Sequence, residues 1–230
     1  KRESIRVGKA KRFVLRFSNN SEARIFKIVE PKSPGNHLLG LFRNSTAQLE
    51  HRYHLRCQDL NLAATRSLGY LELRRGPFLL RACQIQEPID FEKLPLLETF
   101  FPKQLRLFEK DAISALATAI ARMHLKRFFH NDLKGFHAFI KQTGTYNSGA
   151  TQYNLLWIDL ARVGFKLTKR QRIINLYQVF RYILPRNPKH QKHFIRVYCD
   201  ISGWHKENHH KALDSVTLFL NYKLRTHPTP

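Results

Sequence analysis

Two acidic residues stand in settings that suit phosphoryl transfer. Asp132 lies in the run His130-Asn131-Asp132-Leu133-Lys134-Gly135-Phe136-His137, which fits the catalytic-loop pattern H-x-D-x-x-x-x-[N] except that His137 occupies the last position. Asp159 follows the apolar run 155–158, which is typical of a buried strand that delivers one carboxylate to a site. Transfer of a γ-phosphoryl group needs one carboxylate to orient the attacking hydroxyl and accept its proton, and another to hold Mg²⁺. We assign the first role to Asp132 and the second to Asp159.

Each of these fragments also has a simpler interpretation. An H-x-D triplet arises by chance, and an Asp after an apolar strand is often a turn residue or a helix cap. The order of the neighbouring elements favours chemistry, because a long helical pattern precedes the loop and a short apolar strand, 138–140, follows it. A turn rich in Gly, Ser and Thr then leads to the strand that ends at Asp159. We therefore predict one phosphotransfer site.

Lys27 and Glu50 are the predicted nucleotide-binding pair. Residues 3–30 alternate apolar and polar side chains as strands do, and Lys27 takes the place of the strand lysine that contacts the α- and β-phosphates of ATP. Glu50 lies early in a helical pattern from Ser45 to Leu60, where its carboxylate would fix the direction of the lysine. The alternatives are an outward-facing surface lysine and a glutamate that only favours the helix dipole. The distance between the two side chains distinguishes these interpretations.

Lys134 and His137 complete the predicted site. Lys134 follows Asp132 by two positions and is placed to neutralise the transferred phosphoryl group, although it is equally an ordinary surface lysine. His137 replaces an amide that would reach the metal. Imidazole can ligate a divalent ion, whereas Mg²⁺ prefers oxygen. The alternative role for His137 is a hydrogen bond within the loop.

Hydrophobic periodicity predicts an α+β chain with two lobes that position these residues. We expect a sheet-rich N-lobe with one helix over residues 1–88 and a mainly helical C-lobe over residues 89–230. Residues 84–94 would connect the lobes and bind adenine through their backbone. The expected elements are strands within 3–30, at 69–74, 77–83, 138–140 and 155–158, and helices at 45–60, 105–126, 168–184, 189–201 and 206–225.

Two motifs of protein kinases are absent from the sequence. The first strands contain Gly8 but no G-x-G-x-x-G, so backbone amides and lysines would have to cover the phosphates. Leu160-Ala161-Arg162-Val163 follows Asp159 in place of the usual D-F-G continuation, and no A-P-E segment comes after it. The activation loop of a protein kinase is therefore not expected.

The composition describes a folded and strongly basic protein. With 43% hydrophobic and 12% aromatic residues, the 230-residue chain can bury one large core or two small ones. Its 40 Lys and Arg exceed its 17 Asp and Glu, which gives a formal charge of +23. Such a charge attracts polyanions. The candidates are nucleic acid, an anionic membrane face, and a phosphorylated or acidic-sugar substrate.

The cysteines and the hydropathy bear on the compartment. Cys57, Cys83 and Cys199 have no C-x-x-C spacing, which supports neither a zinc site nor a disulfide framework and favours a reducing compartment. No apolar run is long enough to span a bilayer, and no signal peptide is visible. We expect a cytoplasmic protein that is at most peripheral to a membrane.

Taken together, these motifs resemble the bacterial lipopolysaccharide kinase family, which comprises inner-core heptose kinases, Kdo kinases and relatives with a compact protein-kinase-like fold. The most specific likeness is His130-x-Asp132 followed by His137, because this family often has His at the last position. The segment 158–162 is similar to the family's metal-binding segment, including its arginine. The order of the candidate residues also agrees: Lys27, Glu50, Asp132, Asp159.

The resemblance implies ATP- and Mg²⁺-dependent phosphorylation of a heptose or Kdo hydroxyl in the lipopolysaccharide inner core, at the inner face of the cytoplasmic membrane. The acceptor would be an anionic glycolipid, which the basic charge would attract. Residues 166–172 and 186–196 are candidate contact surfaces. Two alternatives stay open. One is a nucleic-acid- or polyanion-binding kinase-like protein without catalysis, although no RNP-type aromatic motif is present; the other is a kinase for a protein or small-molecule acceptor.

Overall fold

The structure is a computed structural model that describes residues 2–6, 12–19, 22–31, 44–88, 109–134, 137–145, 151–184, 187–205 and 207–226. The chain forms two compact units. The first comprises Lys1–Asp90 together with Asp159–Ala161, and the second comprises Phe91–Ile158 together with Arg162–Pro230.

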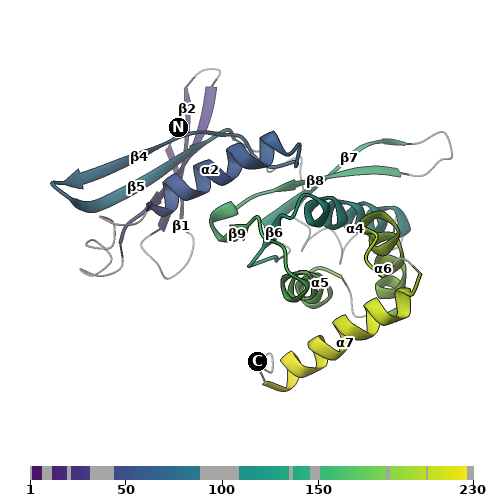
Figure 1. Cartoon of the computed structure of the whole chain (residues 1–230). Helices are drawn as coiled ribbons and strands as arrows, with labels where there is room; N and C mark the ends of the chain where they lie inside the picture. Colours follow the sequence, from purple (N-terminus) through teal and green to yellow (C-terminus); the bar gives the residue numbers. More distant parts are fainter. Residues whose placement is uncertain are drawn as a thin grey trace. The chain divides into compact units, whose positions relative to one another are not determined.

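The first unit is an antiparallel sheet that carries one helix. The strands have the order β1-β2-β3-β5-β4, and helix α2 packs on β3, β4 and β5 (Figure 1). A small apolar core of Ala47, Leu79 and Ala82, with Tyr70 against it, holds the helix to the sheet. The elements are β1 (Arg2–Arg6), β2 (Arg12–Asn19), β3 (Glu22–Val29), α2 (Thr46–Asp59), β4 (Ser67–Arg75) and β5 (Phe78–Gln86).

Helix α2 begins where the sequence predicts. The Ser45 side chain accepts a hydrogen bond from the Gln48 backbone N–H at 3.1 Å, which is a standard N-cap contact. The helix ends at Leu60, and Asn61 follows with φ of 53°, a left-handed conformation that Asn tolerates. The buried residues of the helix are Ala47, Glu50, His54 and Cys57. Their spacing defines one helical face, and half of that face is polar.

One expectation about β5 is wrong. We expected the connection to leave the sheet at Gln84, but β5 continues to Gln86. Gln84 lies opposite Lys27 of β3 in the antiparallel register, and both glutamines are buried. The polar side chains suggested a loop because a buried strand usually reads as apolar. The expected connection beyond residue 88, the glycine at position 8, the first residues of the helix expected at 105 and the turn before residue 151 lie outside the described residues.

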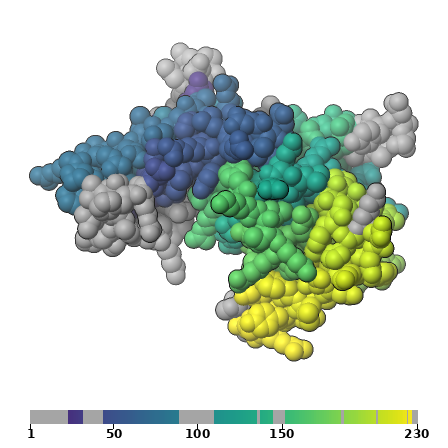
Figure 2. Space-filling view, in the orientation of Figure 1, coloured from purple at the N-terminus to yellow at the C-terminus, as the bar shows by residue number. Residues whose placement is uncertain are grey.

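The second unit is built on four helices within the described residues. They are α4 (Glu109–Leu125), α5 (Lys169–Tyr182), α6 (Pro188–Ser202) and α7 (His209–Thr226). Helix α4 packs on α6, and α7 packs on α5 and α6 (Figures 1 and 2). Thr168 and Gln171 form a capping box at the start of α5, and Gly203 ends α6 with φ of 69°, so local sequence sets these boundaries.

Short strands in the second unit fix the two ends of the candidate loop. Strand β6 (Phe129–His130) pairs with β9 (Val163–Gly164), and β7 (Ala138–Thr145) pairs with β8 (Thr151–Trp157). A one-turn 3₁₀ helix, η2 (Leu160–Arg162), precedes β9. A Cβ at Gly164 would lie 2.5 Å from the Phe129 ring, so this close pairing requires glycine. The sequence did not predict β6, η2 or β9, because two or three residues carry no periodicity.

None of the helices in the described part of the chain combines the length and the apolar character that crossing a membrane would require.

Candidate active site

Lys27 and Glu50 form the expected ion pair. Lys27 Nζ, on β3, lies 2.6 Å from Glu50 Oε1, on α2. The side chains are 22% and 6% exposed, respectively. Glu50 lies beyond the first turn of α2, which contains no acid. The two alternatives, an outward surface lysine and a glutamate that serves only the helix dipole, are therefore wrong.

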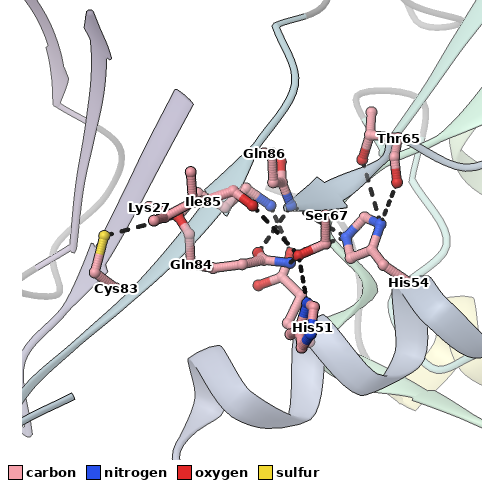
Figure 3. A network of polar contacts seen from close by, with 10 residues as sticks. Lys27, His51, His54, Thr65, Ser67, Cys83, Gln84, Ile85 and Gln86 are labelled. Atoms are coloured by element: carbon pink, nitrogen blue, oxygen red, sulfur yellow. Dashed lines mark hydrogen bonds and ion pairs between the residues drawn. The ribbon is translucent and has the colours of Figure 1, made fainter. Parts of the chain in front are cut away.

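A buried polar cluster surrounds the Glu50 carboxylate, and we call it the Glu50 cluster: Glu50, His54, Thr65, Ser67, Gln84 and Gln86. With its amide nitrogen turned toward the acid, Gln84 donates to both Glu50 oxygens at 3.1 Å. His54 Nε2 lies 3.7 Å from Glu50 Oε1. Figure 3 shows the glutamines of the sheet and the histidines of the helix gathered at one place. The carboxylate is thus held by a cation on one side and by neutral polar groups on the other.

The tautomer of His54 follows from its partners. Its Nδ1 lies 2.5 Å from the Thr65 backbone carbonyl, which can only accept, so Nδ1 carries the proton. Its Nε2 lies 3.1 Å from Gln86 Nε2 and 3.7 Å from Glu50 Oε1. The imidazole is fully buried. Both ring nitrogens of His54 therefore contact other residues of the Glu50 cluster.

The pKa of Glu50 reports how strongly the cluster favours the charged carboxylate. Burial by itself would raise this pKa, but the Lys27 charge, with the contact to His54, lowers it to about 2. A buried carboxylate stays ionised only if such partners offset its desolvation. Glu50 is therefore a permanent anion that fixes the direction of the Lys27 ammonium.

Asp132 lies among basic side chains at the turn after β6. Lys134 Nζ is 2.9 Å from Asp132 Oδ1, and Arg162 Nη1 is 3.9 Å from Oδ2. Partial burial alone would raise the pKa of the carboxyl, but the hydrogen bond and charge of Lys134, with the charges of His137 and Arg162, hold that pKa below its ordinary value. Asp132 is thus ionised at neutral pH. Lys134 contacts it directly, and its role toward a transferred phosphoryl group stays a prediction.

The two histidines of the motif bind the peptide groups of Asp132. His137 Nδ1 donates to the Asp132 backbone carbonyl at 2.5 Å, and His130 Nδ1 accepts from the Asp132 backbone N–H at 3.2 Å. The two rings stack with centroids 5.4 Å apart. The loop hydrogen bond, which was the alternative role for His137, is present. Histidines that ligate metals commonly make such a hydrogen bond with one ring nitrogen and bind the metal with the other.

Asp159 follows the β7–β8 hairpin. The Ile158 backbone N–H donates to the His137 carbonyl at 2.9 Å, so the residue before Asp159 is paired with the candidate ligand His137. Asp159 is half-buried and has φ of 55°, a conformation that is uncommon outside glycine and is enriched at functional sites.

The predicted Mg²⁺ site would use few protein ligands. Among the residues that the structure describes, no group of three or more His, Cys, Asp or Glu is arranged to hold a metal ion. Mg²⁺ usually takes one or two carboxylates from the protein and completes its shell with substrate phosphates and water. A single carboxylate such as that of Asp159 is compatible with such a sparse set, whereas a zinc site would need more protein ligands.

The structure also places residues that the sequence analysis missed. Asn175 and Gln178 of α5 are buried and bind the backbone of the loop around Asp132. Gln84, Gln86 and His54 similarly support Glu50. A signal was present, since these polar residues occupy positions where the helical or strand period places buried side chains. Such positions usually require a partner.

Comparison with solved structures defines the class of the fold. The chain is similar to "WaaP in complex with acyl carrier protein", with a TM-score of 0.66 and 15% identity over 100% of this chain and 90% of that chain. It is also similar to the BubR1 kinase domain, with a TM-score of 0.53 and 11% identity over 97% and 80% of the two chains. The fold is therefore that of the protein kinases, in an α+β form, as the sequence analysis predicted.

The family follows from the sequence model that matches this chain. The model described as "Lipopolysaccharide kinase (Kdo/WaaP) family" matches residues 36–198, and the chain belongs to that family. A search of the curated proteins found no match. The predicted resemblance is confirmed, and the protein is a member of a family of lipopolysaccharide kinases.

Proposed function

We propose that this protein transfers the γ-phosphoryl group of ATP to a heptose or Kdo hydroxyl of the lipopolysaccharide inner core. The observation that carries the proposal is the ion pair between Lys27 and the buried Glu50. Burying a charge is costly, and an ion pair by itself adds little stability, whereas a lysine held in a fixed direction is what nucleotide phosphates require. Family membership supports the nature of the acceptor.

Each predicted residue then has a role. The Lys27 ammonium, oriented by Glu50, binds the α- and β-phosphate oxygens of ATP. The acceptor hydroxyl donates a hydrogen bond to the Asp132 carboxylate and passes its proton to that carboxylate as its oxygen bonds to the γ-phosphorus. The bond from that phosphorus to the bridging oxygen breaks, and ADP leaves with the electron pair of that bond. Because the pKa of Asp132 is held below its ordinary value, the residue releases the proton to water after transfer, and Lys134 neutralises charge on the phosphoryl group.

Asp159 and His137 would hold Mg²⁺, which when bound neutralises the β- and γ-phosphates. His137 is fixed for this by its own bond to the Asp132 carbonyl. The arrangement ties the metal ligand to the peptide of the residue that orients the acceptor.

Basic surfaces of the second unit are the proposed contacts for the anionic glycolipid. The start of α5 exposes Lys166, Lys169 and Arg170, and α6 exposes Lys189, Lys192 and Arg196. A surface of this charge also favours an anionic membrane face, so we place the protein at the inner face of the cytoplasmic membrane.

The rival function is binding of nucleic acid or another polyanion without catalysis, which the charge of +23 favours. Its signature is steep salt dependence of RNA binding in the absence of ATP turnover.

One assay separates these functions. The protein is incubated with γ-labelled ATP and Mg²⁺ against lipopolysaccharide with an unphosphorylated inner core, a generic protein and a panel of small sugars. Purified acyl carrier protein is added in parallel, because the WaaP structure was solved with it. We expect label on the lipopolysaccharide alone. Label on the generic protein or on a small sugar would reassign the acceptor, and no transfer together with salt-dependent RNA binding would support the rival.

A further inference from the structure

Buried amide side chains of α5 bind the backbone that carries Asp132. Asn175 and Gln178 are one helical turn apart on the buried face of α5, with 0% and 8% exposure. Both belong to the second unit, as do all the groups that they contact. Amides differ from carboxylates and ammonium groups because one side chain both donates and accepts.

Asn175 binds both the backbone N–H and the backbone carbonyl of His130. Its Oδ1 accepts from the His130 N–H at 3.1 Å, and its Nδ2 donates to the His130 carbonyl at 2.6 Å. The remaining donor goes to Gln178 Oε1 at 3.1 Å, and the remaining acceptor position takes the His124 Nε2 hydrogen at 3.2 Å. Every hydrogen-bonding position of the amide is thus used, so its orientation is fixed.

Gln178 binds backbone groups of the residues on both sides of Asp132. Its Nε2 donates to the Asn131 carbonyl at 2.9 Å, and its Oε1 accepts from the Leu133 N–H at 3.3 Å. The peptide groups of Asp132 itself are bound by His130 and His137. The backbone around Asp132 is therefore held from α5 by the two amides and from within the loop by the two histidines.

The hydrogen bonds that fix Asn175 continue into the helical core of the second unit. His124 Nδ1 bonds the Tyr198 hydroxyl at 2.7 Å, and that hydroxyl accepts from Arg172 at 2.7 Å. His124 and Tyr198 come from α4 and α6 and are buried. The amide that holds His130 is thus fixed to three helices, which makes it part of a rigid support and not a mobile surface contact.

We propose that Asn175 and Gln178 are positioning residues that hold the backbone of residues 130–133 and so aim the Asp132 carboxylate at the acceptor hydroxyl. The first part concerns only the loop, and the second rests on the proposed function. An isosteric change at Asn175 is informative because Asn175→Asp keeps both acceptor contacts. It loses both donors and sets a carboxylate against the His130 carbonyl.

The test combines kinetics with amide hydrogen exchange on the full chain. Because displacement of a reacting group by about 1 Å can cost 10²-fold, we expect Asn175→Asp to lower kcat about 100-fold and to change the KM for ATP less than about twofold. Gln178→Met, which removes the acceptor of the Leu133 N–H, should speed exchange of that amide and lower kcat about 10-fold. Label transfer to unphosphorylated lipopolysaccharide provides kcat.

Asn208→Asp is the matched control. Asn208 lies just before α7 and accepts from the Lys211 N–H at 3.0 Å, and an aspartate keeps that bond, so the same amide-to-acid change outside the proposed contact surfaces should leave kcat and exchange at Leu133 unaltered. Wild-type kcat in Asn175→Asp, or unchanged exchange in Gln178→Met, would overturn the proposal. If Asn175→Asp does not fold, Gln178→Met carries the test. If the wild type transfers no label to any acceptor, the proposed function fails, whereas the exchange data still decide whether the amides hold the loop.

Discussion

The two units each contain a buried polar cluster behind a candidate functional residue, and the clusters differ in kind. The Glu50 cluster of the first unit is charged and joins side chain to side chain. The cluster of the second unit, which we call the Asn175 cluster (His124, Arg172, Asn175, Gln178 and Tyr198), meets the loop through neutral amides that bind backbone groups.

This difference follows from what each cluster must orient. A lysine side chain is aimed by an opposite charge, which has to be buried and kept ionised by further partners. A loop backbone offers both N–H and carbonyl groups, and an amide matches both without introducing charge. The comparison teaches that the Glu50 cluster should depend on the presence of its counter-ion, whereas the contact of the Asn175 cluster with the loop should depend on the exact amide chemistry.

The largest expected effect comes from removing the group that the Asn175 cluster serves. Asp132→Asn should lower the rate of phosphoryl transfer about 10³-fold, because the acceptor hydroxyl loses its oriented proton acceptor. Binding of ATP, measured by calorimetry, should stay near the wild-type value, since the lysine of β3 is untouched. Transfer at the wild-type rate would contradict the assignment of Asp132.

The next largest effect comes from removing the counter-ion of the other cluster. Lys27→Met leaves Glu50 as an unpaired buried charge, which should destabilise the fold by about 3–5 kcal/mol and weaken ATP binding. Adding Glu50→Gln should recover part of that stability, because the orphaned charge is gone, but should not recover ATP binding. Denaturant unfolding of the single and double variants measures this coupling. Equal stability of the single and double variants would show that the pair is not coupled.

A third prediction separates the clusters by pH. The folded-state pKa of Glu50, about 2, is below the ordinary value of 4.5, so its contribution to stability is present above about pH 4.5 and is lost as the pH falls toward 2. Burial, helped by the Arg172 charge and opposed by the hydrogen bond that His124 donates to Asn175, lowers the pKa of His124 from 6.5 to about 3. Between about pH 3 and pH 6.5 the unfolded state therefore binds more protons than the folded state. The free energy of unfolding consequently falls as the pH drops from about 6.5.

The measurement is the free energy of unfolding as a function of pH. His124→Gln should flatten the curve between about pH 6.5 and 3, and Glu50→Gln should flatten it between about pH 4.5 and 2. Asp59→Asn, at an exposed acid on the same helix as Glu50, is the control and should leave the curve unchanged. If both variants flatten the same pH window, the distinction between the clusters does not hold.

The smallest effect is expected at the far end of the Asn175 cluster. Tyr198→Phe removes the hydroxyl that links Arg172 to His124 but keeps the ring packing, and should cost about 1 kcal/mol. Because the Tyr198 hydroxyl bonds His124 and Arg172, and reaches the loop only through His124 and Asn175 among the described residues, kcat should change less than in Asn175→Asp. Thermal unfolding measures the loss of stability, and the transfer assay measures kcat. If Tyr198→Phe lowers kcat more than Asn175→Asp does, the effect on the loop does not decrease with distance from it.

Parts of the candidate site were readable from the sequence because they are local. The spacing of His130, Asp132 and His137 lies within one loop, and the caps at Ser45 and Thr168 lie next to the helices that they begin. Lys27 and Glu50 were predicted from their places in a known order of elements, and their contact over 23 positions is confirmed. Strand β5 was cut short at Gln84, because a polar residue in a strand pattern reads as the end of the strand.

By itself, the sequence determined the order of the elements, the basic charge and the identity of the residues fit for phosphoryl transfer, because periodicity and motif spacing are local properties of the chain. Only the tertiary structure decided which polar residues are partners. Gln84 meets Glu50 through the register of β5 on β3 and the packing of α2, and Asn175 meets His130 across 45 positions. A buried polar side chain needs a partner, but which one it finds depends on how distant elements pack.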